Sequence, residues 1–483
     1  MQESADSRKN TVIPIALEED STAVVSLYEA HQKVYPRSVK GFFNYWRWIF
    51  VGLTQLIFYG LPWLNWGERQ AVLFDLGSRR FYIFNLVLYP QDFIYLTGLL
   101  VISALSLFLF TAIAGRLWCG FACPQSVYSK IFMWIEYRIE GDRANRIRLD
   151  QGPLNIDKLC RKTSKHGLWI AISLWTGFTF VAYFTPIKTL TAEVLALQLG
   201  AWEIFWILFY GFATYGNAGW MREQVCKYMC PYARFQSAMF DRDTLIVSYD
   251  QQRGENRGSR GRKLTRPEYV AQGLGDCIDC GLCVQVCPTN IDIRNGLQYE
   301  CISCGGCIDV CNSIMDKMSY PRGLIRFSTL SGMAQKMPPA AMFKRMLRPR
   351  VMLYSGILLS LCLGLLISLN VRAPFKVDIV RDRNSLARIV GPGKIENTYR
   401  LQIMNATEHV QHYKIELAGI PDLSLDSEYI VEVGPAQSRW IGLRAQLNPG
   451  ILKSGSHPVD FLITVQGEKP QQLREKSVFL VPR

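Results

Sequence analysis

Eight cysteines lie close together in the sequence and repeat one spacing, C-x2-C-x2-C-x3-C. The first run is Cys277, Cys280, Cys283 and Cys287, and the second is Cys301, Cys304, Cys307 and Cys311. Three thiolates on one tight loop can bind three corners of a cubane cluster, and the fourth cysteine of each run then reaches the other cluster. The spacing therefore predicts two [4Fe-4S] clusters, one held by Cys277, Cys280, Cys283 and Cys311, and the other by Cys301, Cys304, Cys307 and Cys287.

A disulfide framework and a structural zinc site are the alternatives for so many cysteines. Disulfide frameworks belong to small secreted domains, and zinc sites usually combine separated cysteine pairs with histidine. No histidine lies between His166 and His409, so mixed zinc ligation is disfavoured. Pro288 follows the first run and turns the chain there, as in a two-cluster bacterial ferredoxin. Asn312 follows the second run instead, which departs from that pattern and leaves the ligands in place.

Two further cysteine pairs share a second spacing, C-x3-C-P. Cys119 and Cys123 precede Pro124, and Cys226 and Cys230 precede Pro231. Each pair follows an apolar segment and precedes an aromatic, amphipathic stretch, which indicates an internal duplication. On a helix, residues i and i+4 share a face with Cβ atoms about 5–6 Å apart, which suits two ligands of one soft metal better than a disulfide.

Together the two pairs would supply four thiolates, for Cu(I) or for a third iron–sulfur cluster. Nearby thioethers add soft donors, from Met221, Met229 and Met239. The alternative is that these cysteines are small apolar residues at helix ends. Packing is the expected role of the two remaining single cysteines, Cys160 and Cys362.

Apolar segments predict how these cysteines are positioned. Hydrophobic residues make up 49% of the 483 residues. Five segments have the length and polarity of membrane-spanning helices, about 30 Å each, with Glu203 as the one acidic exception. The predicted spans are Trp48–Trp66, Phe93–Gly115, Leu168–Ile187, Leu195–Tyr215 and Val351–Val371.

Charge predicts the orientation of these spans. Lysine and arginine are abundant before the first span, between the second and third, and between the fourth and fifth, whereas the loop before the fourth span carries only Lys188 and Glu193. The positive-inside rule then places the N-terminus and the cysteine-rich loop in the cytoplasm and the C-terminal part outside. The net charge of +14 is largely a topology signal, and the basic stretch Arg253–Arg266 is interpreted as lying beside anionic lipid rather than nucleic acid.

The region after the fifth span contains no cysteine and has the pattern of a β-domain. Short alternating runs are separated by glycine, proline and asparagine, including Gly391-Pro392-Gly393, which predicts an antiparallel sandwich of immunoglobulin type. The expected strands are Tyr399–Met404, Tyr413–Leu417, Tyr429–Val433, Trp440–Leu443, Val459–Val465 and Ser477–Val481. His409 and His412 could form half of a copper site, although a pair exposed at a strand end is the simpler interpretation.

The sequence contains no pattern that indicates another redox group. None of the five histidines, His31, His166, His409, His412 and His457, lies within a predicted span, which excludes a bis-histidine haem in the bilayer. No dinucleotide-binding glycine motif and no P-loop is present. Electrons must therefore enter from another protein, a quinol or a small reductant.

The order of these parts resembles the cytochrome c oxidase accessory proteins of the FixG, RdxA and CcoG type. Similarity extends to the segments Arg69–Leu76, Arg80–Phe84 and Pro90–Phe93. The resemblance implies a protein of the bacterial inner membrane that acts in assembly of a cbb3-type oxidase by reducing Cu(II) to Cu(I). It further implies that the ferredoxin cysteines relay electrons and that Cys119, Cys123, Cys226 and Cys230 either meet copper or form a further relay. Expected partners are copper ions, copper chaperones, oxidase assembly factors and an unidentified electron donor.

The sequence thus predicts a multidomain membrane protein. The expected parts are a cytoplasmic segment (1–45), spans one to four with the first C-x3-C-P motif (46–220), a cytoplasmic region with the second motif and a ferredoxin insert (221–350, insert about 265–320), a fifth span (351–371) and an outer sandwich (373–483). Two other functions remain open: a quinol-oxidising membrane ferredoxin that feeds a periplasmic reductase, and a non-enzymatic copper-holding scaffold.

Overall fold

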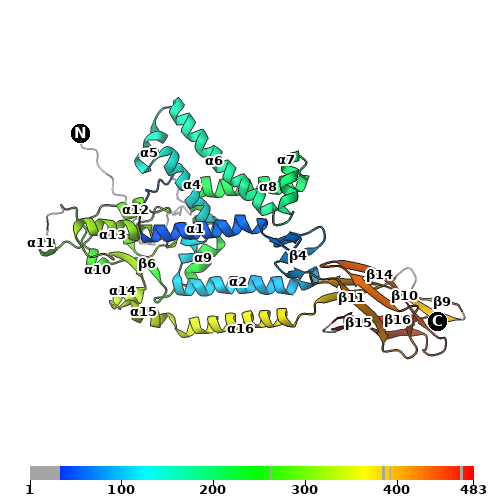
Figure 1. Ribbon diagram of the computed structural model, residues 1–483. Helices are drawn as coiled ribbons and strands as arrows, with labels where there is room; N and C mark the ends of the chain where they lie inside the picture. Colours follow the sequence, from blue (N-terminus) through cyan, green and yellow to red (C-terminus); the bar gives the residue numbers. More distant parts are fainter. Residues whose placement is uncertain are drawn as a thin grey trace, which may run out of the picture. The chain divides into compact units, whose positions relative to one another are not determined.

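The computed structural model describes residues 33–482 apart from 262, 263, 265, 383–386, 392 and 468–470 (Figure 1). Most of the predicted N-terminal segment 1–45, including His31, therefore lies outside the described residues. The same is true of Pro392 in the predicted turn 391–393.

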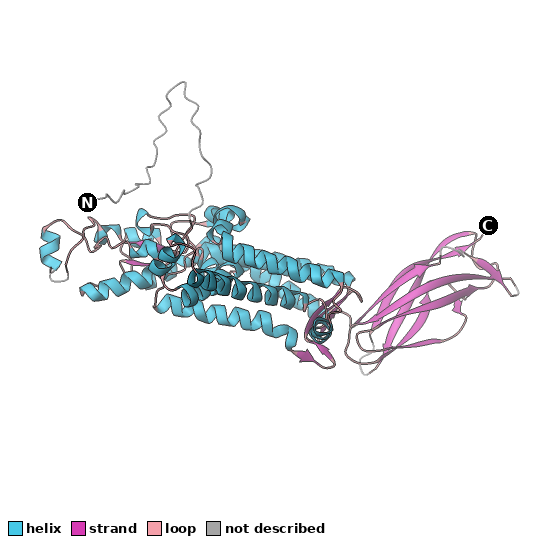
Figure 2. Ribbon diagram, turned by 90° about the horizontal axis from the view of Figure 1, so that it is seen from above, coloured by secondary structure: helices cyan, strands magenta, loops and turns pink. Residues whose placement is uncertain are grey.

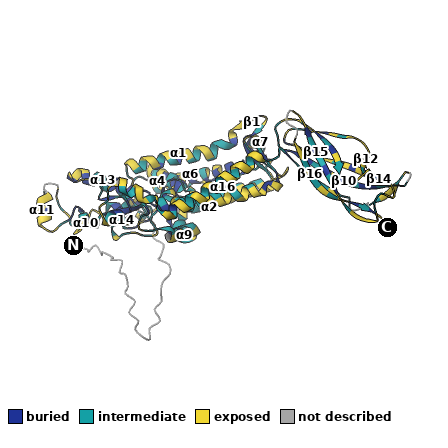
Figure 3. Cartoon of the chain, turned by 90° about the horizontal axis from the view of Figure 1, so that it is seen from below, coloured by how far each residue is buried: buried dark blue, intermediate teal, exposed yellow. Residues whose placement is uncertain are grey.

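Within the described residues, two helices are long and apolar enough to cross a membrane. They are α2 (Phe93–Ala114), preceded by the 3-10 turn η2 (Pro90–Asp92), and α16 (Pro349–Val371). Their residues are mostly exposed (Figure 3), as expected of surfaces that lipid would cover. A third span is possible from α7 (Ile187–Ala196) and α8 with its continuation (Ala201–Met221), which are bent by 98° at a short break.

The structure does not confirm the five predicted spans. The first predicted span, Trp48–Trp66, does not coincide with a helix. Helix α1 covers Phe42–Gly60 and contains Arg47, and the chain then forms a 3-10 turn η1 (Leu61–Trp63). In α6 (Ile156–Val181) the first half is rich in lysine and arginine, so the apolar part ends at Val181 after about 20 Å, which is shorter than the hydrocarbon core. The predicted span Leu195–Tyr215 is not one continuous helix, because α7 ends at Ala196 and α8 begins at Ala201.

The two apolar helices α2 and α16 lie side by side and run antiparallel (Figure 1). Near the start of α2 the Tyr95 hydroxyl lies 3.3 Å from the carbonyl oxygen of Ser368, close to the end of α16. At the other end, Arg348 donates to the carbonyl of Ala112 over 2.7 Å. The chain therefore returns beside α2 after completing the cysteine-rich region.

A two-stranded sheet closes the cysteine-rich region at its base. Strand β6 (Ile246–Tyr249) pairs antiparallel with β7 (Ile325–Ser328), although the whole insert separates them in sequence. Between them a buried core includes Tyr269, Ile308 and Met315. The helices of this region are α10 (Gln251–Gly254), α11 (Arg266–Ala271), α12 (Leu282–Gln285), η5 (Ile293–Asn295), α13 (Gly306–Met318), α14 (Leu330–Ala334) and α15 (Pro339–Met346).

The C-terminal region forms the predicted antiparallel sandwich (Figure 2). One sheet has the order β12-β14-β10-β8, with β9 beside β10, and the other has the order β13-β11-β15-β16. Apolar side chains from both sheets share one core, with Tyr399, Tyr413 and Phe461 fully buried. The strands are β8 (Phe375–Arg381), β9 (Arg388–Val390), β10 (Lys394–Asn405), β11 (Gln411–Ala418), β12 (Ser424–Leu425), β13 (Tyr429–Val433), β14 (Ser438–Leu447), β15 (Gly455–Gln466) and β16 (Gln472–Val481).

Short strands connect α1 to α2 and contact the sandwich. Tyr89 donates to the carbonyl of Asn405 over 2.8 Å, and buried Asp92 forms an ion pair with Arg372 at 2.6 Å. The start of α2 is therefore joined to the sandwich, whereas its end contacts the cysteine-rich region. The strands are β1 (Asn65–Trp66), β2 (Arg69–Gln70), β3 (Val72–Asp75), β4 (Arg80–Ile83) and β5 (Leu86–Leu88).

Candidate iron–sulfur and thiolate sites

The eight clustered cysteines line two neighbouring cavities. One cavity is bordered by Cys277, Cys280, Cys283 and Cys311. The other is bordered by Cys287, Cys301, Cys304 and Cys307, with Cys283 also at its edge. The fourth cysteine of each run therefore lies with the first three of the other run. This grouping is the one that the spacing predicts for two [4Fe-4S] clusters, and ligation itself stays a prediction.

Two glycines shape the loops that carry these cysteines. Gly281 precedes α12 with φ of +64°, and Gly305 precedes α13 with φ of +72°, a conformation that side chains with a Cβ rarely adopt. At Gly305 a Cβ would also lie 2.5 Å from the Phe43 ring of α1. The loops can therefore turn tightly around a cavity while α1 packs against the second of them.

The chemistry of these thiols fits a bound cluster. Burial raises the pKa of Cys283, Cys301 and Cys311 to about 12, so a bound metal must displace their protons. Among the described residues, no three cysteine, histidine, aspartate or glutamate side chains lie close enough to share a single ion. A cubane needs wider spacing, because its four thiolates bind four different irons.

The two C-x3-C-P motifs share a break in the helix at the second cysteine. Cys119 lies in α3 (Leu117–Phe121) and Cys226 in the π-helical turn η4 (Val225–Met229). Cys123 and Cys230 are extended, and they precede α4 (Pro124–Glu140) and α9 (Pro231–Met239). The predicted i, i+4 placement on one helix is therefore wrong. The residue before a proline is driven from the helical region, so each helix breaks at its second cysteine.

These four cysteines gather in one place even though the motifs are far apart in sequence. Burial raises the pKa of Cys119 to about 11 and of Cys226 to about 12, and the neighbouring thiols add to both shifts. Cys123 and Cys230 likewise lie close enough for their charges to interact. Gln236, which is fully buried in α9, donates its amide to the sulfur of Cys119 over 3.3 Å.

The four-cysteine site lies directly against the second cavity of the insert. A Cβ on Gly120 would be 2.6 Å from the carbonyl oxygen of Ile302 and 2.9 Å from the Cα of Cys304. Only glycine allows this approach, so the chain beside Cys119 touches the loop that carries Cys304. The Arg47 side chain also donates a hydrogen bond to the carbonyl of Gly120 over 3.1 Å.

Arg116 connects the two sites electrostatically. Its side chain is 3% exposed and donates to the carbonyls of Tyr299 and Ala233. Its positive charge acts to lower the pKa of Cys301 on one side and of Cys119 and Cys226 on the other, against the larger effect of burial. A buried guanidinium between two thiol groups stabilises negative charge on both.

Sequence reasoning missed Arg116, Gln236 and the contact at Gly120. The available signal was weak: an arginine three residues before Cys119 and a glycine directly after it. His412 lies 3.6 Å from the carboxylate of Glu432, and a copper half-site at His409 and His412 stays a prediction. The sulfur of Met239 accepts a hydrogen bond from Arg350.

Models of known protein families match three parts of the chain. Residues 221–330 match a "4Fe-4S dicluster domain", and residues 96–139, which include Cys119 and Cys123, match a "4Fe-4S binding domain". Residues 365–482 match the "IG-like fold at C-terminal of FixG". The chain therefore carries iron–sulfur domains and an immunoglobulin-like domain of the FixG kind.

Related proteins extend the match over most of the chain. The nitrogen fixation protein FixG of Rhizobium meliloti is 37% identical over 82% of this chain and 81% of its own length. In Cereibacter sphaeroides, protein RdxB is 38% identical over 84% of this chain and 86% of its own length. Protein RdxA of the same organism is 37% identical over 81% of this chain and 84% of its own length. The order of parts, the cysteine geometry and these similarities show that the chain belongs to the FixG/RdxA family.

Proposed function

We propose that this protein is a membrane-bound electron-transfer protein that reduces Cu(II) to Cu(I) at the four-cysteine site. The observation that supports this most directly is the packing of Gly120, beside Cys119, on the backbone of Cys304. Thiols from both C-x3-C-P motifs thereby lie next to the predicted second cluster.

The residues of the insert fit two [4Fe-4S] clusters, which when bound supply one-electron redox chemistry. Cys277, Cys280, Cys283 and Cys311 would hold one and Cys287, Cys301, Cys304 and Cys307 the other. The fold places Cys277 and Cys283 in the buried core of the insert and packs Cys301, Cys307 and Cys311 against it. Arg116 lies between the second cavity and the four-cysteine site and offsets negative charge on both sides.

Copper is the substrate in this proposal. Each Cu(II) takes up one electron and becomes Cu(I), and thiolates bind Cu(I) in preference to Cu(II). Among the described residues no three of these thiols lie close enough to share one ion, so a pair of thiolates from Cys119, Cys123, Cys226 and Cys230 would bind Cu(I) and favour the reduced ion. The electron originates from a donor that is still to be identified.

The proposed topology places the insert and the sandwich on opposite sides of the membrane. The end of α2 contacts the β6 side of the insert through the Leu245 N–H, which donates to the Ile113 carbonyl over 3.0 Å. The start of α2 contacts the sandwich through Tyr89. With basic loops in the cytoplasm, the N-terminus and the cysteines lie inside and the sandwich outside. The multi-pass arrangement of the bacterial inner membrane then includes α1, α6 and α8 as further membrane helices.

Within the cell, the proposed role is to supply Cu(I) for assembly of a cbb3-type oxidase. Copper chaperones and oxidase assembly factors would be the partners, with the thiol-free sandwich as a docking domain outside the membrane.

The test measures Cu(I) formation by the reduced full-length protein under anaerobic conditions, with a chromogenic Cu(I) chelator. We expect Cys119→Ser combined with Cys226→Ser to abolish the reaction and to leave the iron content of the insert unchanged. Cys160→Ser is the matched control, because Cys160 is an exposed single cysteine in α6. Absence of Cu(I) formation by the unaltered protein, or an unchanged rate in the double variant, would contradict the proposal.

A second candidate function for the four cysteines is a third iron–sulfur cluster. The match of residues 96–139 to a 4Fe-4S binding domain favours it, because those residues include Cys119 and Cys123. Iron analysis separates the two candidates: two clusters require about eight irons per chain and three require about twelve. The double variant Cys119→Ser, Cys226→Ser would lower the count only in the second case.

A further inference from the structure

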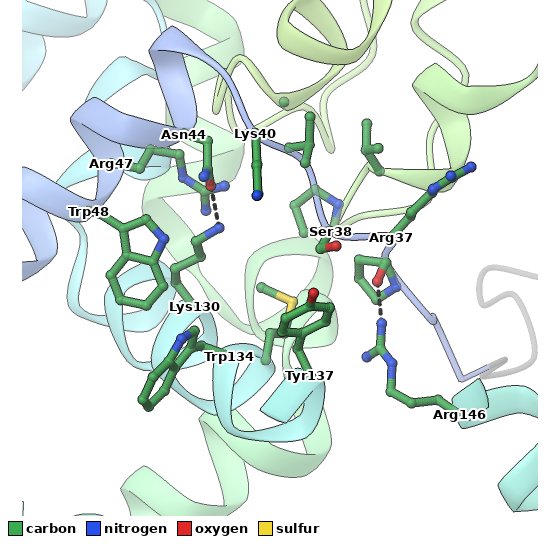
Figure 4. Close-up of a pocket in the computed structure, with 16 residues that line it drawn as sticks. Arg37, Ser38, Lys40, Asn44, Arg47, Trp48, Lys130, Trp134, Tyr137 and Arg146 are labelled. Atoms are coloured by element: carbon green, nitrogen blue, oxygen red, sulfur yellow. Dashed lines mark hydrogen bonds between the residues drawn. The ribbon is translucent and has the colours of Figure 1, made fainter. Parts of the chain in front are cut away.

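A cavity of about 240 Å³ lies where the N-terminal segment, α1, α4 and the insert meet (Figure 4). Its volume equals that of about eight waters in the liquid. Residues 36–48 and α4 form most of the wall, and Val286, Pro288 and Gly306 of the insert complete it. None of the proposed electron-transfer steps uses this cavity, which we name the Lys40–Lys130 pocket.

Five cationic side chains line the Lys40–Lys130 pocket. Two of them have carboxylate partners: Arg146 pairs with Glu136 at 3.0 Å, and Arg37 lies 3.9 Å from Asp142. The remaining three form no ion pair with any carboxylate in the described part of the chain, and they are Lys40, Arg47 and Lys130.

Lys130 shows that these charges are not compensated. Its ammonium donates only to the Asn44 side chain, over 2.6 Å. Burial, followed by the nearby Arg47, lowers the pKa of Lys130 to about 7. The Cys304 thiol and, more weakly, Asp309 act in the opposite direction, and both oxygens of the Asp309 carboxylate already accept backbone N–H groups, from Phe43 and Asn44. A bound anion would offset the repulsion between the two cations.

Neutral donors and aromatic rings complete a site for a phosphate group. In Figure 4 the ends of Lys40 and Lys130 and the hydroxyl groups of Ser38 and Tyr137 face the same space. Trp134 forms part of the wall, and its ring lies 6.2 Å from that of Trp48. Lysine ammonium and hydroxyl groups are suitable donors to phosphate oxygens.

The neighbouring surface indicates where the phosphate comes from. Directly beside the pocket, α1 exposes Phe42, Tyr45 and Trp46, which are 66%, 65% and 41% exposed. Tryptophan and tyrosine are enriched at the membrane–water interface, and basic pockets between helices on the cytoplasmic side bind anionic headgroups.

We propose that the Lys40–Lys130 pocket binds the phosphate group of an anionic phospholipid. The inference rests on the proposed topology and not on copper chemistry. Because the wall includes the N-terminal segment, α4 and the insert, a bound headgroup would hold the insert against the membrane helices. It would also neutralise positive charge beside Arg47, whose side chain donates to the carbonyl of Gly120 between the two cysteine sites.

The experiment measures lipid binding to the full-length protein with its clusters. Phospholipid that copurifies is identified by mass spectrometry, and affinity is then measured in nanodiscs of phosphatidylcholine with increasing phosphatidylglycerol. We expect Lys40→Gln combined with Lys130→Gln to weaken binding of phosphatidylglycerol by about tenfold per lysine, which corresponds to about 1.4 kcal/mol each.

Lys317→Gln combined with Lys344→Gln is the matched control, because both lysines are exposed and lie outside the pocket. Iron content verifies that each variant is folded. Binding of inorganic phosphate in lipid-free micelles, lost in the pocket variant only, would support the same chemistry with soluble phosphate as its source. Equal binding of phosphatidylglycerol by the pocket and control variants would overturn the proposal, whatever the copper assay gives.

Discussion

The eight cysteines of the insert and the four of the C-x3-C-P motifs reach their sites by different routes. The insert supplies all eight from one short stretch, on glycine-shaped loops closed by β6 and β7. The other four come from two stretches that are far apart in sequence. They meet only because α3 and α9 pack together, as the Gln236 contact with Cys119 shows.

This difference concerns the contacts that hold each group of cysteines in place. Cysteines on one loop can be arranged by local backbone conformation, and they lie largely in the core of the insert. Cysteines that meet across the fold depend on every contact between the elements that carry them. Exposure does not separate the two groups, because all four are half-buried and the insert cysteines range from buried to exposed, with Cys280 exposed.

The largest expected effect comes from removing one cysteine from each group. We expect Cys304→Ala to lose one cluster, about four irons per chain, together with copper reduction. Cys226→Ala should abolish copper reduction alone. Iron analysis and the Cu(I) assay on both variants check this, and loss of iron in both would show that the two groups do not differ in this way.

The pH dependence of copper binding gives the next largest effect. Because the pKa of Cys119 is raised to about 11 and that of Cys226 to about 12, both thiols are protonated between pH 6 and 8. Each proton displaced by Cu(I) then makes the apparent affinity rise by about tenfold per pH unit. Competition with a Cu(I) chelator at several pH values measures the slope. A flat profile would mean that fewer than one proton leaves and that the buried thiols are not the ligands.

The contact between the two groups is tested by Gly120→Ala. The added Cβ would meet backbone atoms of Ile302 and Cys304, and such overpacking costs about 1–3 kcal/mol. We expect the variant to form Cu(I) more slowly and to keep its iron content unchanged. Gly167→Ala is the control, because its Cβ would meet nothing within 4 Å. Equal rates in the two variants would show that electrons do not pass through this contact.

The smallest expected effect concerns the start of α1. Asp309 accepts the N–H groups of Phe43 and Asn44 and so caps this helix from within the insert. Loss of a cap costs about 1–2 kcal/mol, so Asp309→Ala should speed hydrogen exchange at these two amides by about 5–30-fold. Asp309→Asn should have a smaller effect. Unchanged exchange in Asp309→Ala would show that the cap contributes nothing.

The sequence predicts the cysteine sites of the insert better than the site formed by the two C-x3-C-P motifs. The grouping of Cys311 with Cys277 was predictable, because ligand spacing on one loop is a local property. The placement of Cys123 was predicted incorrectly, although Pro124 carried the signal that the helix breaks there. Within the sandwich, the six expected strands are present, whereas β8, β9 and β12 were missed.

Contacts between distant elements had no usable signal. Arg116, Gln236 and Asp309 each act on a residue more than a hundred positions away, and no local pattern marks them. Three of the five predicted spans are not confirmed, for a related reason. Apolar residues in α1 and in the second half of α6 resemble a span in composition, but Arg47 and the basic first half of α6 shorten the apolar stretch.

The cap on α1 also has a consequence for biosynthesis. Asp309 lies 265 residues after Asn44, so at about 5–20 residues per second the ribosome reaches it roughly 10–50 s later. Until then, the first N–H groups of α1 have only water or lipid headgroups as partners. The cap closes only when α13, which carries Cys307 and Cys311, has folded. A newly made chain thus caps the start of its first helix only after the region that receives the metal clusters is in place.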